Sequence, residues 1–155
     1  MVECELVRIV IRENADRQYI YLREKGGDRA FPIVIGVSEA AEINRKAVGE
    51  RTLRPLTHDL LRCVIGALGA AMTGVEISDL RENTFFAHLI ITQGDREMRV
   101  DCRPSDAVAL AVAESAPIFV AESVLAVAAP EITPQAEQNP PEDPPKESEE
   151  GPEEA

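Results

Sequence analysis

Two short segments place arginine, a hydroxyl residue and aspartate around the expected start of a helix. The first reads RPLTHDLL and contains Arg54, His58 and Asp59, and the second reads RPSDAVAL and contains Arg103 and Asp106. If the two segments meet in the fold, they form a cluster of two arginines, two carboxylates and one imidazole. Carboxylates and an imidazole can bind a divalent metal ion, while arginines and free helix N–H groups attract phosphate. This combination is suited to phosphodiester hydrolysis, in which a metal ion activates water.

Each segment can also be explained as an efficient helix start that has no further function. Proline holds the preceding residue in extended geometry, and a Ser or Thr hydroxyl can cap a free backbone N–H. An aspartate in the first turn is favoured by the helix dipole by about 0.3–1 kcal/mol. The residues concerned are Pro55, Thr57 and Asp59 in the first segment and Pro104, Ser105 and Asp106 in the second. Spacing alone leaves both interpretations open.

The elements that carry these segments follow from the pattern of apolar residues. Strands are expected over 2–12, 18–24, 29–36, 74–80, 85–93, 97–102 and 118–120, and helices over 39–48, 57–72, 105–115 and 123–129. Ser38 and Gly49 are start and stop signals for the first helix. The helix over 57–72 has the 3.6-residue period of an amphipathic helix. Strands in groups of three with helices between them predict an α+β domain with a mixed, mostly antiparallel sheet and about three to four helices.

Charge and proline divide the chain into two parts. The formal net charge of the whole chain is −12, but residues 130–155 alone hold nine acids, one lysine and seven of the eleven prolines. A segment with so few large apolar residues cannot offset the entropy cost of ordering. We therefore expect one compact domain over residues 1–129 and a disordered acidic tail over residues 130–155, which serves solubility or docks a protein partner.

Cysteine content and hydropathy bear on the compartment. Three cysteines without metal-ligand spacing favour a reduced, cytoplasmic environment. No apolar run approaches the ~18–20 residues of a membrane span, and the N-terminus has acids where a signal peptide has basic residues. We expect a cytoplasmic protein without a membrane partner.

Four blocks of the sequence, taken in order, resemble one known family. The blocks are FPIVIGVSEAAEI, RPLTHDLL, ISDLRENTFFAHLII and VDCRPSDAVALAV, the last followed by PIFVAESVL. Over residues 2–128 the chain resembles the bifunctional nuclease domain family of bacteria and of plant defence-related proteins. The resemblance implies a compact α+β domain that self-associates and acts on both DNA and RNA. It draws attention to Glu39, Glu42, Arg54, His58, Asp59, Glu82, Asn83, Arg103 and Asp106.

Chemical roles for these residues are assigned from physical chemistry, as a hypothesis. Asp59 and Asp106 are the expected carboxylate ligands of a divalent metal, Mg²⁺ or Mn²⁺, and His58 is a general base or a further ligand. Arg54 and Arg103 are expected to bind phosphate. Glu39 and Glu42 are weaker metal candidates, because Glu42 is also placed to form an i,i+4 ion pair with Lys46 on a solvated helix face.

The charge of the predicted domain argues against strong nucleic-acid binding. Residues 1–129 carry a net charge of −4 and only two lysines, and Glu114 stands where we expect a basic residue in a family member. Non-specific binding to nucleic acid depends on a basic surface that displaces counterions. Two functions therefore stay open: a homo-oligomeric nuclease that binds DNA and RNA weakly, and a non-catalytic self-associating module that binds a small anionic ligand, a nucleotide or a protein.

Overall fold

The computed structural model describes residues 1–129, and the tail predicted for residues 130–155 lies outside them. The strands are β1 (Val2–Val10), β2 (Gln18–Glu24), β3 (Ala30–Ile35), β4 (Ala71–Arg81), β5 (Thr84–Gln93), β6 (Arg96–Cys102) and β7 (Ile118–Val120). The helices are α1 (Val37–Ala47), α2 (Thr57–Ala67), α3 (Pro104–Glu114) and α4 (Glu122–Ala128). All the predicted elements are present in the predicted order.

The strands form one sheet in the order β3-β2-β1-β7-β4-β5-β6. Neighbouring strands are antiparallel except for β4 and β7, which are parallel. The short strand β7 therefore joins two antiparallel groups, β1–β3 and β4–β6, each contiguous in the sequence. The turn between β2 and β3 contains Gly26 with a φ of 77°, the left-handed geometry that glycine adopts at little cost. This arrangement confirms the predicted α+β fold with a mostly antiparallel sheet.

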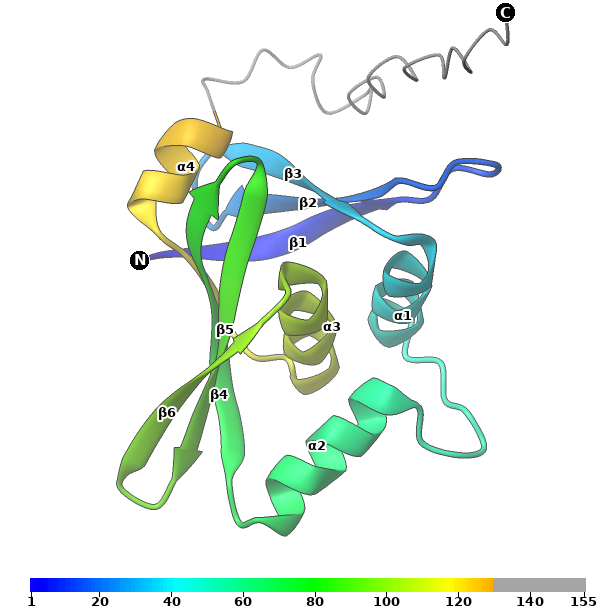
Figure 1. Ribbon diagram of the computed structural model, residues 1–155, viewed down its shortest axis with the longest axis vertical. Coiled ribbons are helices and arrows are strands. Elements are labelled where there is room, and N and C mark those ends of the chain that lie inside the picture. The colour runs from blue at the N-terminus through cyan, green and yellow to red at the C-terminus, as the bar shows by residue number, and fades with distance from the viewer. Residues whose placement is uncertain (130–155) are drawn as a thin grey trace, which may run out of the picture.

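Helix α3 lies at the centre of the molecule. In Figure 1 it is surrounded by the two strand groups and by α1 and α2. Ser105 and every residue from Ala107 to Ala111 are buried, so the helix has no solvent-exposed face along this stretch. The small alanine side chains allow the sheet and α1 to approach the helix closely. The sequence of this helix, PSDAVALAVAE, is apolar on nearly all sides, which agrees with this burial.

Helix α2 corrects one prediction. It ends at Ala67, and residues 71–72 belong to β4, because Gly69 adopts a left-handed φ of 71° and ends the helix. Ile65 packs against the core, but no α2 residue is buried, and Leu60, Leu61, Val64 and Leu68 are exposed. The 3.6-residue period did predict an amphipathic helix. Within residues 1–129, however, nothing covers most of its apolar side.

The helix starts differ in detail from the predicted caps. The residues that flank the first turns are Gly36, Leu56 and Arg103 rather than Ser38, Thr57 and Ser105, and none of them makes a side-chain capping bond. Helix α1 begins two residues earlier than predicted and α3 and α4 one residue earlier, while α2 begins at Thr57 as predicted; Ser38, Thr57 and Ser105 therefore lie inside the first turns. Pro104 occupies the first turn of α3, where its missing N–H costs nothing. Among residues 1–129, no helix has the length and apolar character needed to cross a bilayer.

Candidate active site

The two segments singled out in the sequence meet in the fold. His58 lies in the first turn of α2 and Asp106 in the first turn of α3, and His58 Nε2 is 2.9 Å from Asp106 Oδ1. Both side chains are mostly buried, with 16% and 24% of their surface exposed. A carboxylate in hydrogen-bond contact with a ring nitrogen fixes the orientation of the imidazole and favours one tautomer. The structure thus forms a histidine–aspartate pair.

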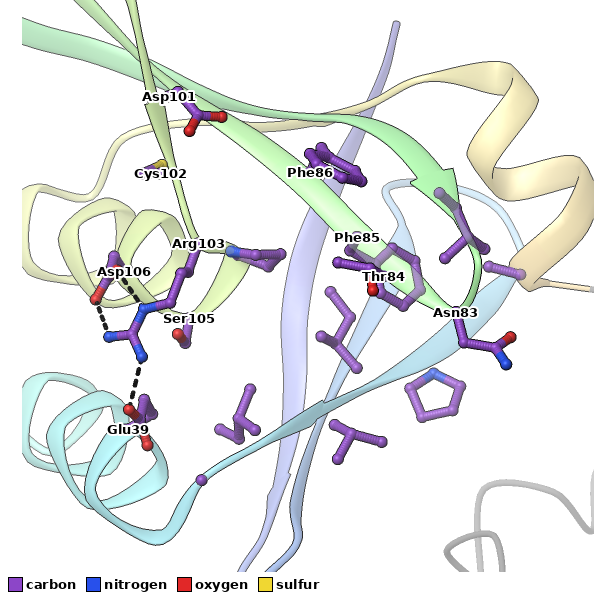
Figure 2. A pocket seen from close by; sticks show the side chains of 18 of the residues that line it. Glu39, Asn83, Thr84, Phe85, Phe86, Asp101, Cys102, Arg103, Ser105 and Asp106 are labelled. Carbon is purple, nitrogen blue, oxygen red and sulfur yellow. Dashed lines mark hydrogen bonds and ion pairs between the residues drawn. The ribbon is translucent and has the colours of Figure 1, made fainter.

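Arg103 holds the other side of the same carboxylate. Its Nε donates to Asp106 Oδ2 over 2.8 Å and its Nη2 to Asp106 Oδ1 over 3.0 Å, a two-pronged contact. Its Nη1 donates to Glu39 Oε1, in the first turn of α1, over 2.9 Å. Figure 2 shows these bonds linking the starts of α1 and α3. Three helix N-termini therefore contribute one charged or ionisable side chain each to a single cluster.

The environment keeps both of these carboxyl groups ionised. Burial alone would raise the pKa of Asp106, but hydrogen bonds from Arg103 and His58 outweigh it and hold the pKa below its ordinary value. The pKa of Glu39 is lowered first by a hydrogen bond from its own backbone N–H and then by Arg103. Asp106 is therefore a hydrogen-bond acceptor at neutral pH and can stabilise a protonated His58.

Asp59 belongs to a neighbouring ion cluster and not to the Asp106 pair. Its carboxylate accepts hydrogen bonds from Lys46, from Arg45 Nη2 at 3.3 Å and from the Leu56 N–H at 3.0 Å. Led by the bond from Lys46, these contacts lower the pKa of Asp59 to about 2. The carboxylate that was expected to bind metal is thus neutralised by two cations of α1.

Glu42 links the two clusters. It accepts two hydrogen bonds from Arg45, at 2.8 and 2.9 Å, and lies 3.7 Å from Lys46 Nζ, the i,i+4 pair expected from the sequence. Its Oε1 is also 3.7 Å from His58 Nδ1. His58 therefore stands between the carboxylates of Asp106 and Glu42, each facing a different ring nitrogen.

Arg54 is not part of either cluster. It lies in the exposed loop between α1 and α2, and within residues 1–129 its side chain makes no hydrogen bond or ion pair. Thr52 Oγ1 donates to its backbone carbonyl over 2.6 Å, which fixes the course of the loop but not the guanidinium. The structure therefore places one of the two predicted phosphate-binding arginines at the candidate site and leaves the other free in solvent.

Four further residues from the matched blocks, Glu82, Asn83, His88 and Cys102, lie outside the two charged clusters. Glu82 and Asn83 form the β4–β5 turn with φ values of 48° and 59°. His88, on β5, is half-buried and faces Asp101 of β6 across the sheet. Burial, followed by repulsion from Asp106, raises the pKa of Cys102 to about 12, so this thiol stays protonated.

A divalent metal ion needs several oxygen or nitrogen donors that converge on one point. Within residues 1–129, no three His, Cys, Asp or Glu side chains are arranged to hold an ion together. Arg103 already bridges Glu39 and Asp106, and Lys46 and Arg45 occupy Asp59. The residues as arranged do not form the expected metal site.

An open pocket adjoins Arg103 and was not anticipated from the sequence. It encloses about 1140 Å³ between β3 on one side and the start of β5 on the other, with Asp106, Arg103 and Glu39 in its wall. The apolar part of the wall includes Ile33, Leu80 and Phe85. Three of the four matched blocks, FPIVIGVSEAAEI, ISDLRENTFFAHLII and VDCRPSDAVALAV, contribute to it. The presence of these blocks in the family resemblance was the one signal in the sequence that pointed to the pocket. Strand periodicity could not locate it, because periodicity does not show which strands face each other.

Comparison with known proteins agrees with the family resemblance. The profile of the bifunctional nuclease domain matches residues 20–133. Uncharacterized proteins from two strains of Mycobacterium tuberculosis, CDC 1551 / Oshkosh and ATCC 25618 / H37Rv, are each 47% identical over 128 residues, which cover 83% of this chain and 76% of the relative. The matched region contains α1, α2, α3 and all the residues of the two charged clusters. The chain belongs to the bifunctional nuclease domain family.

Proposed function

We propose that the protein hydrolyses phosphodiester bonds of DNA and RNA at the cluster formed by His58, Asp106 and Arg103. The observation that carries the proposal is the 2.9 Å contact between His58 Nε2 and Asp106 Oδ1, directly beside the exposed guanidinium of Arg103. This places a proton acceptor, the group that orients it and a phosphate-binding cation within one cluster. Family membership supports a nuclease-type function independently of the geometry.

The proposed reaction uses water as the nucleophile, because DNA has no 2′-hydroxyl group. His58 takes a proton from the water as its oxygen bonds to phosphorus, and the bond from phosphorus to the leaving sugar oxygen breaks. Asp106 accepts the hydrogen bond from Nε2, so Nδ1 receives the proton on the side that faces Glu42 Oε1 at 3.7 Å, and the two carboxylates then stabilise the imidazolium. His58 afterwards returns a proton to the leaving oxygen. General acid–base catalysis of this kind contributes about 10²–10⁴ in rate.

Arg103 supplies the positive charge for the phosphoryl oxygens. A guanidinium group has five N–H donors, and residues 1–129 provide acceptors for three of those of Arg103. Its side chain is 63% exposed, so the other donors are open to a ligand. Because Asp106 and Glu39 fix the plane of the guanidinium, little entropy is lost when it binds a phosphate group.

Metal dependence stays a prediction. Mg²⁺ or Mn²⁺ could bind Asp106 and Glu39 only after Arg103 releases them, and Asp59 is held by Lys46. For this reason no step of the proposed reaction is assigned to a metal ion. Addition of EDTA to an active preparation tests the point directly.

The experiment that tests the function is a cleavage assay with end-labelled single- and double-stranded DNA and RNA. It compares the wild-type protein with His58→Ala in Mg²⁺, in Mn²⁺ and in EDTA. His88→Ala, which removes the other histidine of the chain, is the matched control and reports contaminating nuclease. We expect cleavage by the wild type and by His88→Ala, and a loss of at least about a hundredfold in His58→Ala. Equal cleavage by all three proteins, or by none, would contradict the proposal.

A second candidate function is a non-catalytic, self-associating module that binds an anionic ligand, a nucleotide or a protein. The observation that favours it is the apolar side of α2, where Leu60, Leu61, Val64 and Leu68 remain exposed. Exposed apolar patches of this kind commonly mark protein–protein contacts. We propose homo-oligomer formation through α2 for either function. Cytoplasmic location and a protein partner for residues 130–155 stay predictions.

A further inference from the structure

The pocket beside Arg103 is formed where the two sides of the curved sheet approach each other. Strand β3 is one edge of the sheet, and β5 lies near the other edge. Yet the rings of Phe31 on β3 and Phe85 on β5 stack with their centroids 5.7 Å apart and an interplanar angle of 27°. The pocket lies beside this contact, with Phe85 in its wall. This side of the pocket is therefore held in place by packing of the core.

The two walls of the pocket differ in chemistry. Figure 2 shows Arg103 with Asp106 and Glu39 on one side, and Phe85, Thr84 and Asn83 on the other. Ile33, Ile35 and Leu80 add apolar surface to the wall of the pocket. A ligand that spans the pocket must therefore join an anionic group to a flat or apolar group. The volume of about 1140 Å³ is ample, since small-molecule sites usually enclose about 300–1,000 Å³.

Polar backbone groups complete the wall beside Phe85. The pairing of β6 with β5 ends at the Ala87–Cys102 pair. From Thr84 to Phe86, therefore, the side of β5 that faces away from β4 has no partner strand within residues 1–129. Unpaired N–H and C=O groups next to an aromatic ring can recognise the polar edge of a flat heterocycle, and so can the Asn83 amide, which is both donor and acceptor.

We propose that this pocket binds one unstacked nucleobase next to the phosphate that Arg103 holds, so that single-stranded nucleic acid is the substrate of the site. The inference rests on the proposed function, because that function identifies the phosphate that reacts. The position of the base is inferred from the pocket itself. In a duplex the bases are stacked and paired, and extracting one costs a few kcal/mol. A single strand offers its bases freely, and stacking on an aromatic ring is tolerant of sequence.

A binding experiment separates the pocket from catalysis. The probe is a short DNA strand with a central 2-aminopurine, used single-stranded and annealed to its complement, and the protein is the full chain carrying His58→Ala so that the strand is not cleaved. Fluorescence should rise as the base leaves the stack and enters the pocket. One base stacked on an aromatic ring contributes about 1–3 kcal/mol, or roughly 5- to 150-fold in affinity. We expect the single strand to bind at least about fivefold more tightly than the duplex.

Two substitutions test whether the pocket is responsible for binding the single strand. Val127 on α4 lines the pocket and is 69% exposed, so Val127→Trp fills space without disturbing the core. Val48→Trp, at the end of α1 with 66% exposure and outside the pocket, is the matched control. Phe85→Leu removes the ring while keeping an apolar side chain. We expect Val127→Trp and Phe85→Leu each to lower single-strand affinity at least about fivefold, with Val48→Trp unchanged.

The outcomes distinguish this inference from the proposed function. Equal affinity for single strand and duplex, or unchanged single-strand binding in Val127→Trp, would overturn the base pocket; an extended protein segment would then be the better occupant of the open strand edge. Cleavage by the wild type without preference for single strands would overturn the pocket but keep the function. Single-strand binding that Val127→Trp weakens, without cleavage by the wild type, would keep the pocket and remove the function.

Discussion

His58 and Asp106 are separated by 48 positions in the sequence, yet their side chains meet at 2.9 Å. The contact joins the first turns of two helices whose N-termini are directed at the same cluster. Carboxylates are favoured near helix N-termini, so Asp106 stabilises the start of α3 and orients His58 at the same time. The two interpretations of the sequence segments, helix start and catalytic residue, therefore do not exclude each other.

Substitution of Asp106 separates these two roles. Asp106→Asn keeps the shape of the side chain but removes the charge that stabilises a protonated His58. We expect the cleavage rate to fall by about 10²–10⁴, while the melting temperature changes little because asparagine keeps the shape of the side chain and can still accept hydrogen bonds from Arg103 and His58. Cleavage kinetics and thermal unfolding of the same preparations check this. A large loss of stability with unchanged cleavage would reduce Asp106 to a helix-start residue.

The helix pattern and the RP motifs were sufficient to predict where α2 and α3 begin, but whether the two helix starts meet stayed a hypothesis until the structure placed His58 against Asp106. The same reasoning could not place Arg54. Helix α2 begins only after the exposed residues 48–56, and the length of that loop decides where an arginine in it can reach. Asp59 is a similar case, since its contacts with Lys46 and Arg45 depend on the angle between α1 and α2, which periodicity does not encode.

Arg103→Lys tests whether the shape of the guanidinium is used. Lysine keeps the positive charge but cannot make the two-pronged contact with Asp106 together with the bond to Glu39. We expect kcat/KM to fall at least about tenfold, because a misplaced cation stabilises the phosphoryl oxygens less well. Arg99→Lys is the control, since Arg99 pairs with Glu76 and Glu97 on the sheet surface. Equal effects of both substitutions would show that only the general charge matters.

Asp59→Asn is expected to affect stability more than catalysis. The substitution leaves Lys46, whose side chain is only 6% exposed, without its nearest anion. Loss of a hydrogen bond to a charged group costs about 1–3 kcal/mol. Because the pKa of Asp59 is lowered to about 2 in the folded protein, its stabilisation is present above the ordinary carboxyl pKa near 4 and is lost as the pH falls from about 4 to 2. Urea unfolding of wild type and variant, at neutral pH and between about pH 4 and 2, measures the difference in their free energies of unfolding. This difference should shrink toward about pH 2. A difference that stays constant with pH would contradict the prediction.

The acidic balance of the domain predicts a shallow dependence of nucleic-acid binding on salt. Arg103 is the one arginine in the wall of the pocket among residues 1–129, so one or two phosphate groups are contacted. Each neutralised phosphate of a single strand contributes a slope of about −0.7 to the plot of log affinity against log salt concentration. We expect a slope between about −0.7 and −1.4. Titrations of the His58→Ala variant at several salt concentrations measure it. A much steeper slope would indicate an extended basic surface, for instance one formed between subunits.

The exposed side of α2 leads to the last prediction. Sequence periodicity showed that this helix has an apolar side, but it could not show that the core already has α3 in the central position and leaves that side uncovered. If a second copy of the chain covers it, Leu60→Glu with Val64→Glu should lower the oligomeric state in sedimentation experiments, because burying two carboxylates at an apolar contact is unfavourable. Both residues are exposed, so the secondary structure measured by circular dichroism should not change. Glu substitutions at Val34 and Val37, exposed valines outside α2, are the matched control and should leave the oligomer intact. An unchanged mass for the α2 variant would show that any self-association uses another surface.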